Sequence, residues 1–73
     1  MRVTIYLKSN TGPKPYKTVY FSKNEFARLK KDFEKFQKTG LPKNGAYNEE
    51  IGTSNEEIVY LDFDSIAKIK SNS

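Results

Sequence analysis

Tyrosines and basic residues fall together on the polar side of several alternating stretches in this 73-residue chain. The tyrosines are Tyr6, Tyr20 and Tyr60. The basic residues beside them are Arg2, Lys8, Lys68 and Lys70. A tyrosine ring offers rigid contact area and its hydroxyl tolerates water, which is why tyrosine is enriched at protein interfaces. The pattern predicts a protein-binding surface whose charged rim favours an acidic partner.

The same residues also suit a nucleic acid, which is the alternative hypothesis. Exposed aromatic rings stack on unpaired bases, while Lys and Arg contact phosphates. The consensus aromatic motif of the RNA-recognition fold does not occur in the sequence. The composition of this surface therefore leaves both kinds of partner open, with protein contact favoured.

A second basic group recurs at helical spacing between Ser22 and Gly40. It consists of Arg28, Lys31, Lys35 and Lys38. Four cations on one helix face could follow a phosphate backbone and make binding strongly dependent on salt. The neighbouring carboxylates Asp32 and Glu34 lie at offsets of three and four residues from these cations, so an ordinary solvated helix face explains the stripe as well.

Catalytic and metal-binding chemistry has little support in the residue types. The chain contains no His and no Cys, so the usual proton carrier near neutral pH and the thiolate nucleophile are absent. Asp62 and Asp64 flank Phe63, but no pattern of alternating oxygen ligands surrounds them. We expect Asp64, with Ser65, to shape a turn. We expect no enzyme activity, no metal and no cofactor.

The elements that must position these side chains are short strands around one helix. Polar and apolar residues alternate over residues 2–8, 16–21 and 57–63, which predicts strands with one buried face. The first two strands are expected to form a hairpin. A last short strand is predicted over residues 66–70, with Ala67 and Ile69 inward. A strand over residues 46–51, turning through residues 52–55, has the weakest pattern.

The helix carries its own start and stop signals. Ser22 followed by Glu25 matches a capping box, in which the glutamate also reaches back to the serine N–H. Gly40 suits the left-handed residue that ends a helix, with Leu41 packing back onto it. The stripe of Phe26, Leu29, Phe33 and Phe36 predicts the face that packs on the core.

The predicted fold is α+β, with the order β-β-α-(β)-β-β: a small antiparallel sheet, most simply a single one, with one amphipathic helix on one face. Residues 1–73 form one domain, and residues 71–73 are expected to fray. The other sheet face, with its tyrosines, stays uncovered.

Charge and size suggest how the domain associates. Residues 1–45 contain eleven Lys and Arg against three acidic residues, a net charge of +8, and residues 46–73 contain two Lys against six, a net charge of −4. So small a core also favours self-association as a homo-oligomer. Without an apolar leader or a membrane-spanning run, we expect a cytoplasmic protein with no membrane partner.

Overall fold

The computed structural model describes residues 1–51 and 55–72, without the side chains of residues 51, 55 and 56. Its elements are β1 (Arg2–Leu7), β2 (Lys14–Tyr20), α1 (Lys23–Thr39), β3 (Asn44–Ile51), β4 (Asn55–Asp62), a 3-10 turn η1 (Phe63–Ser65) and β5 (Ile66–Ser71). The predicted α+β class and element order are confirmed, including the weakly patterned strand that becomes β3. The turn predicted over residues 52–55 and the fraying predicted for residues 71–73 fall partly outside the described residues. Within them, Asn55 begins β4, Ser71 ends β5, and the Asn72 N–H donates to the carbonyl of Arg2.

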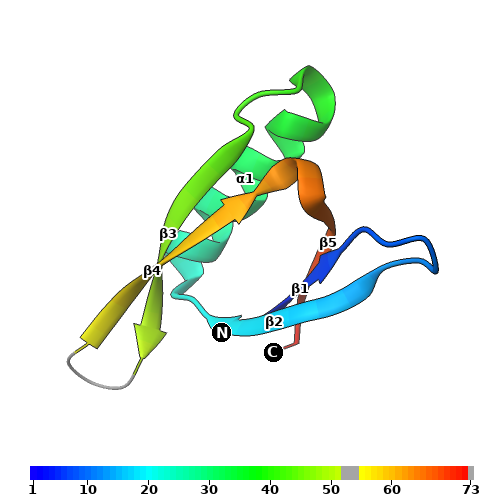
Figure 1. The fold of residues 1–73 in the computed structure, drawn as a ribbon. Coiled ribbons are helices and arrows are strands. Elements are labelled where there is room, and N and C mark those ends of the chain that lie inside the picture. The colour runs from blue at the N-terminus through cyan, green and yellow to red at the C-terminus, as the bar shows by residue number, and fades with distance from the viewer. Residues whose placement is uncertain (52–54, 73) are drawn as a thin grey trace.

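The strands form two sheets, so the simplest expectation of one sheet is wrong. A three-stranded antiparallel sheet has the order β2-β1-β5, and β3 pairs with β4 in a separate two-stranded sheet. Figure 1 shows the β3–β4 hairpin running alongside the helix, with the three-stranded sheet to one side of both. The 3-10 turn η1 forms the corner between the two sheets, because it follows β4 of one sheet and leads directly into β5 of the other. The alternation of polar and apolar residues predicts the two faces of a strand, but it does not predict which sheet the strand joins.

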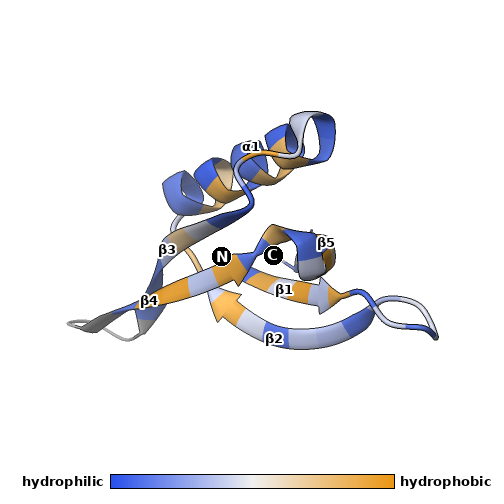
Figure 2. Ribbon diagram, turned by 45° about the horizontal axis from the view of Figure 1, so that its top comes forward, coloured by the Kyte–Doolittle hydropathy of each residue, from blue (hydrophilic) through white to orange (hydrophobic). Residues whose placement is uncertain are grey.

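The helix begins and ends where its signals predict. Ser22 is the N-cap, and its hydroxyl accepts a hydrogen bond from the N–H of Glu25 at 3.1 Å. Gly40 ends the helix with φ of 81°, and its N–H donates to the carbonyl of Phe36. Two details differ: the Glu25 carboxylate turns to other partners, described below, and Leu41 is 58% exposed instead of packing back. Figure 2 shows the hydrophobic side of α1 turned toward the strands.

The core lies between α1 and the inner faces of both sheets. The helix contributes Leu29 and Phe33, with Phe26 and Phe36 partly buried against them, so the predicted phenylalanine stripe is core. The strands contribute mainly Val3, Ile5, Val19, Tyr47, Val59 and Leu61, joined by Phe21, Phe63 and Ile66. Burial of these side chains removes apolar surface from water, which is the main force that stabilises so short a chain.

Two bulges interrupt the three-stranded sheet. In β2 the register passes from Lys17 to Pro15 opposite consecutive residues of β1, which makes Tyr16 the extra residue. In β5 it passes from Lys68 to Ile66, which makes Ala67 the extra residue. Ile66 is therefore the buried residue at the start of β5, and the predicted inward place of Ala67 is wrong. Such bulges re-aim single side chains without ending the strand.

Candidate protein-binding face

Nine side chains form three rows across the side of the three-stranded sheet that the helix leaves uncovered. By register and alternation the rows are Tyr20, Arg2 and Asn72; Thr18, Thr4 and Lys70; and Pro15, Tyr6 and Lys68. We call these nine residues the helix-free face. Three of them are cations and none is a carboxylate, whereas six of the nine acidic residues of the chain lie after residue 45. The face is thus a positively charged surface with two aromatic rings.

Polar contacts hold several of these side chains in place across the strands. The amide of Asn72 donates to the Thr4 hydroxyl at 2.6 Å, and the Thr4 hydroxyl lies 3.4 Å from that of Thr18. The Lys68 ammonium stands over the Tyr6 ring, 4.7 Å from its centroid. Such a cation–π contact orders a long side chain that would otherwise be free. The face is therefore partly pre-organised before any partner arrives.

The two tyrosines of the face differ in how much they offer to a partner. Tyr6 lies half-buried between Pro15 and Lys68, whereas Tyr20 is 51% exposed opposite Arg2 at the other end of β1. Glu49 approaches the edge of this row, where its carboxylate accepts from the Tyr20 N–H at 3.4 Å. Lys8 follows the end of β1, and its N–H donates to the carbonyl of Ser65. Tyr20 is the ring best placed for contact.

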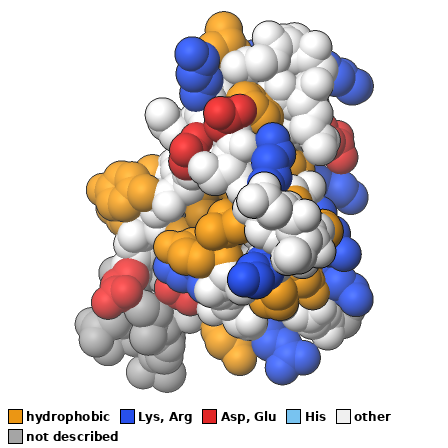
Figure 3. All heavy atoms as spheres, turned by 45° about the vertical axis from the view of Figure 1, so that its right-hand side comes forward, with side chains coloured by type: hydrophobic (Ala, Val, Ile, Leu, Met, Phe, Trp, Pro, Cys, Tyr) orange, Lys and Arg blue, Asp and Glu red, His pale blue; other side chains and the backbone are white. Residues whose placement is uncertain are grey.

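Tyr60 belongs to a different surface. It lies on β4, opposite Ala46 of β3, and is 77% exposed. Together with Tyr16 it borders a groove of about 230 Å³ between the sheets, floored by Ile5, Leu7 and other apolar residues. Figure 3 shows hydrophobic side chains gathered in the middle of one side of the molecule, with Lys and Arg around them. The predicted trio of tyrosines is therefore divided, because β4 does not join the sheet of β1 and β2.

The basic stripe of the helix also divides. Its first member, Arg28, makes a bidentate ion pair with Glu25 at 2.8 and 2.9 Å and donates to the carbonyl of Ala46 at 2.8 Å. Its guanidinium also lies over the Tyr47 ring, 4.4 Å from the centroid. Among the side chains that the structure describes, no other ion pair forms, so Lys31, Lys35 and Lys38 are exposed and have no carboxylate partner there. Three lysines of the stripe, not four cations, are open to a phosphate.

Glu25 and Arg28 together occupy the edge of β3. The Glu25 carboxylate accepts from the N–H of Asn48 at 2.6 Å, while Arg28 donates to the carbonyl two residues earlier. Hydrogen bonds from Arg28 and from Asn48 hold the pKa of Glu25 near 2, well below its ordinary value of 4.5. The bond to Glu25 raises the pKa of Arg28 in turn. The pair satisfies main-chain groups that an exposed edge strand would otherwise offer to another chain.

Tyr47 is the main residue that sequence reasoning missed. It is buried, and its hydroxyl donates to the Asp32 carboxylate of α1 at 2.7 Å. Burial, helped by that carboxylate, raises the pKa of Tyr47, so the hydroxyl keeps its proton. Asp32 was expected to pair with neighbouring helix cations instead. The alternation of Gly45, Tyr47 and Glu49 was the available signal, but residues 44–51 are too polar for it to stand out.

The Asp62 carboxylate stabilises the turn that joins the two sheets. Asp62, not Asp64, caps η1: its carboxylate accepts from the N–H of Asp64 at 3.2 Å and from the Ser65 hydroxyl at 3.0 Å. Carboxylates in the described part of the chain do not gather into a group of three or more that could hold a metal ion. Asp62 therefore has a structural partner in the turn itself.

Comparisons with protein-family models, with curated proteins and with solved structures gave no match. Among residues 1–51 and 55–72, no helix combines the length and the apolar character that crossing a bilayer requires.

Proposed function

We propose that this chain is a small non-enzymatic module that binds an acidic protein surface through the helix-free face. The observation that carries the proposal is the composition of the three rows, in which Arg2, Lys68 and Lys70 share a face with two tyrosines and no carboxylate. Electrostatic complementarity of this kind speeds encounter and selects the partner. Tyr20 supplies the exposed aromatic contact that interfaces favour.

The partner is expected to be a different protein and not a second copy of the face. Two copies of this surface meeting across a two-fold axis would place like charges opposite one another, which destabilises the contact. Specific interfaces use roughly 20–30 residues a side, and the face has nine positions, so we expect a weak and salt-sensitive complex. Any self-association that the small core favours should therefore leave the helix-free face open, and a dimer held by that face would contradict this part of the proposal.

Three substitutions test the site. Tyr20→Ala should lower the recovery of bound protein in a quantitative pull-down at low salt by about tenfold, which corresponds to roughly 1.4 kcal/mol of binding energy. Tyr60→Ala removes a more exposed ring from the other sheet and should leave recovery unchanged. Lys70→Glu should act like Tyr20→Ala without removing an aromatic ring. Equal recovery with all three variants, with the fold intact by circular dichroism, would overturn the proposal.

A nucleic acid is the second candidate partner. The exposure of Tyr20 beside cations favours stacking of an unpaired base, and the exposed Lys31, Lys35 and Lys38 add a separate phosphate-binding stripe. Titration of single- and double-stranded oligonucleotides at about 50 mM salt is decisive, since phosphate-driven affinity is greatest there. Binding that falls steeply with added salt would support this candidate, and no binding at low salt would exclude it.

A further inference from the structure

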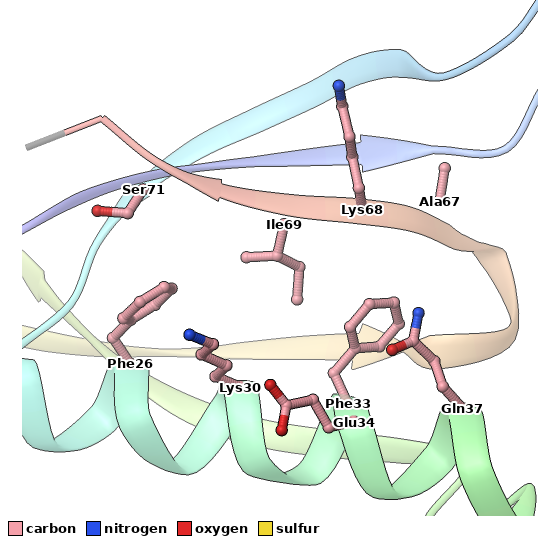
Figure 4. A pocket seen from close by; sticks show the side chains of 9 residues that line it. All are labelled: Phe26, Lys30, Phe33, Glu34, Gln37, Ala67, Lys68, Ile69 and Ser71. Atoms are coloured by element: carbon pink, nitrogen blue, oxygen red, sulfur yellow. The ribbon is translucent and has the colours of Figure 1, made fainter.

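A groove runs between α1 and β5, away from the helix-free face. Its volume is about 360 Å³, and its apolar lining comes from Phe26 and Phe33 of the helix and Ile69 of the strand. Figure 4 shows both phenylalanines directed toward β5 and Ile69 directed toward the helix, while Lys68 points the other way. The volume lies in the range of ligand sites on proteins.

The shape of the groove matches an extended chain. The helix residues that line it run from Phe26 to Gln37, which is a length of about 16 Å at 1.5 Å per residue. The six residues of β5 span nearly the same distance, about 17 Å at 3.3 Å per residue. The groove therefore follows most of the strand, from Ala67 to Ser71, as a site for about five extended residues would.

The main chain of β5 offers hydrogen bonds along this groove. β5 is the edge strand of its sheet, after β2 and β1. The bond from Asn72 N to Arg2 O sets the phase of pairing with β1. Since antiparallel pairs alternate between bonded and non-bonded, the N–H and C=O of Ile69, opposite Ile5, point away from β1. By contrast, Glu25 and Arg28 cover the edge of β3, and Pro15 and the bulge at Tyr16 interrupt that of β2.

The positive charges on β5 favour an acidic segment as the partner in this groove. Lys68 and Lys70 alternate with Ile69 and lie on the outer side of β5, next to the position of any added strand. An added strand whose apolar residues face the helix would place its alternate residues beside these lysines, where acidic side chains are favoured. A second β5 would instead set lysine against lysine, so the lysines disfavour pairing between copies.

We propose that the groove between α1 and β5 binds an extended peptide segment of a partner protein, in which apolar and acidic residues alternate, by adding it as a strand to β5. The apolar residues pack on Phe26, Phe33 and Ile69, and the acidic residues face Lys68 and Lys70. Main-chain bonds to the edge supply affinity, and the two sets of side chains supply specificity. This site is separate from the helix-free face, although the two lysines border both.

A synthetic peptide tests the inference directly. The probe has seven residues in which valine alternates with glutamate, is blocked at both ends and carries a fluorophore. Binding is followed by anisotropy, and amide chemical shifts locate the site. The inference expects shifts along Ile66–Lys70 and along the groove side of α1. It also expects at least about tenfold weaker binding when lysine replaces glutamate, or when the same residues are placed in a non-alternating order.

One substitution and its neighbour provide the matched control. Lys30 is exposed and lines the groove, whereas Lys31 is exposed one position further round the helix. Lys30→Tyr should fill the groove and weaken peptide binding by at least about tenfold, while Lys31→Tyr should bind as the native chain does. Neither change touches a buried residue, so both variants should fold.

Three results would overturn the inference: no binding at about 1 mM peptide, equal binding by the two tyrosine variants, or shifts confined to the helix-free face. Tyr20→Ala should bind the peptide normally. The two proposals can therefore fail separately. Loss of the natural partner in Tyr20→Ala concerns the helix-free face alone, whereas peptide binding concerns the groove between α1 and β5.

Discussion

The Tyr47 hydroxyl donates to the Asp32 carboxylate at 2.7 Å, and this bond ties β3 to the middle of α1. The ring itself is almost fully buried and touches Phe21 and Phe63 at centroid distances of 6.4 and 6.3 Å. A single side chain thus connects the helix, the hairpin and the core of the three-stranded sheet.

Removing that hydroxyl should destabilise the fold without changing its shape. Tyr47→Phe keeps the ring but leaves Asp32 without its donor, and bonds to charged groups contribute about 1.5–3 kcal/mol. We expect a loss of ~1–2 kcal/mol in the free energy of unfolding, measured by urea denaturation, because Asp32 regains some solvent. Tyr60→Phe is the control, since that hydroxyl stands at an exposed position, and it should change stability by less than about 0.5 kcal/mol.

Acid should weaken the fold through Glu25. The pKa of this carboxyl is depressed in the folded chain, to about 2 from 4.5. A depressed pKa means that the ionised form stabilises the fold at pH values above 4.5, and that this contribution is lost as the pH falls from about 4.5 to about 2. We expect a loss on the order of 1–2 kcal/mol, below the full linkage value, because solvent screens the ion pair.

Glu25→Gln should remove this pH dependence. The variant should be less stable than the native chain at neutral pH, and the two stability curves should converge toward pH 2. Glu34→Gln, on the exposed face of the same helix, should leave the native curve unchanged. Parallel curves for the native chain and Glu25→Gln throughout this range would contradict the role given to the carboxylate.

Gly45 should not tolerate a side chain. A Cβ built on this residue would lie 2.7 Å from Cε2 and 2.8 Å from Cζ of Tyr47, two positions along the same strand. Gly45→Ala must therefore displace the buried ring, and overpacking of this kind costs about 1–3 kcal/mol. Thermal unfolding should detect it as a lower melting temperature. If the steric conflict is the cause, combining Gly45→Ala with Tyr47→Ala should cost less than the sum of the two single changes.

Arg28 should not be replaceable by lysine. The guanidinium makes two bonds to Glu25, one to Ala46 and a stacking contact with Tyr47, and a single ammonium cannot reproduce that planar set. Arg28→Lys should lower the free energy of unfolding by ~1 kcal/mol. Lys35→Arg makes the opposite exchange at an exposed position of the same helix and should be neutral. Hydrogen exchange of the Asn48 amide should also become faster in Arg28→Lys, because the Glu25 carboxylate that accepts from this amide is then held less firmly.

Local signals predicted the helix and the faces of most strands. Ser22 and Gly40 act through groups within a few residues of themselves, so their roles can be recognised without knowing the rest of the fold. The inward places of Val3, Val19 and Leu61 follow from alternation for the same reason. Thr4 and Thr18 meet across β1 and β2 as a simple hairpin requires.

Relations between distant segments could not be predicted in this way. The place of Tyr60 depends on whether β4 joins the first sheet, and the place of Tyr16 depends on a bulge opposite β1. Arg28 carries the same sequence pattern as Lys31, Lys35 and Lys38, yet only its position brings it to the edge of β3 and to Tyr47. Pairing partners and register are set by the whole core, not by a window of sequence.

The pairing of Arg2 with Asn72 has a practical consequence for handling the protein. The first and last described residues both lie at the first row of the helix-free face, because Met1 precedes Arg2 and the Asn72 N–H donates to the Arg2 carbonyl; Figure 1 shows β1 and β5 side by side there. An affinity tag fused to either end would block access to the helix-free face. Because the chain contains no cysteine, Lys35→Cys on the exposed side of α1 would give a unique thiol. Immobilisation through that thiol presents the face to solution unobstructed.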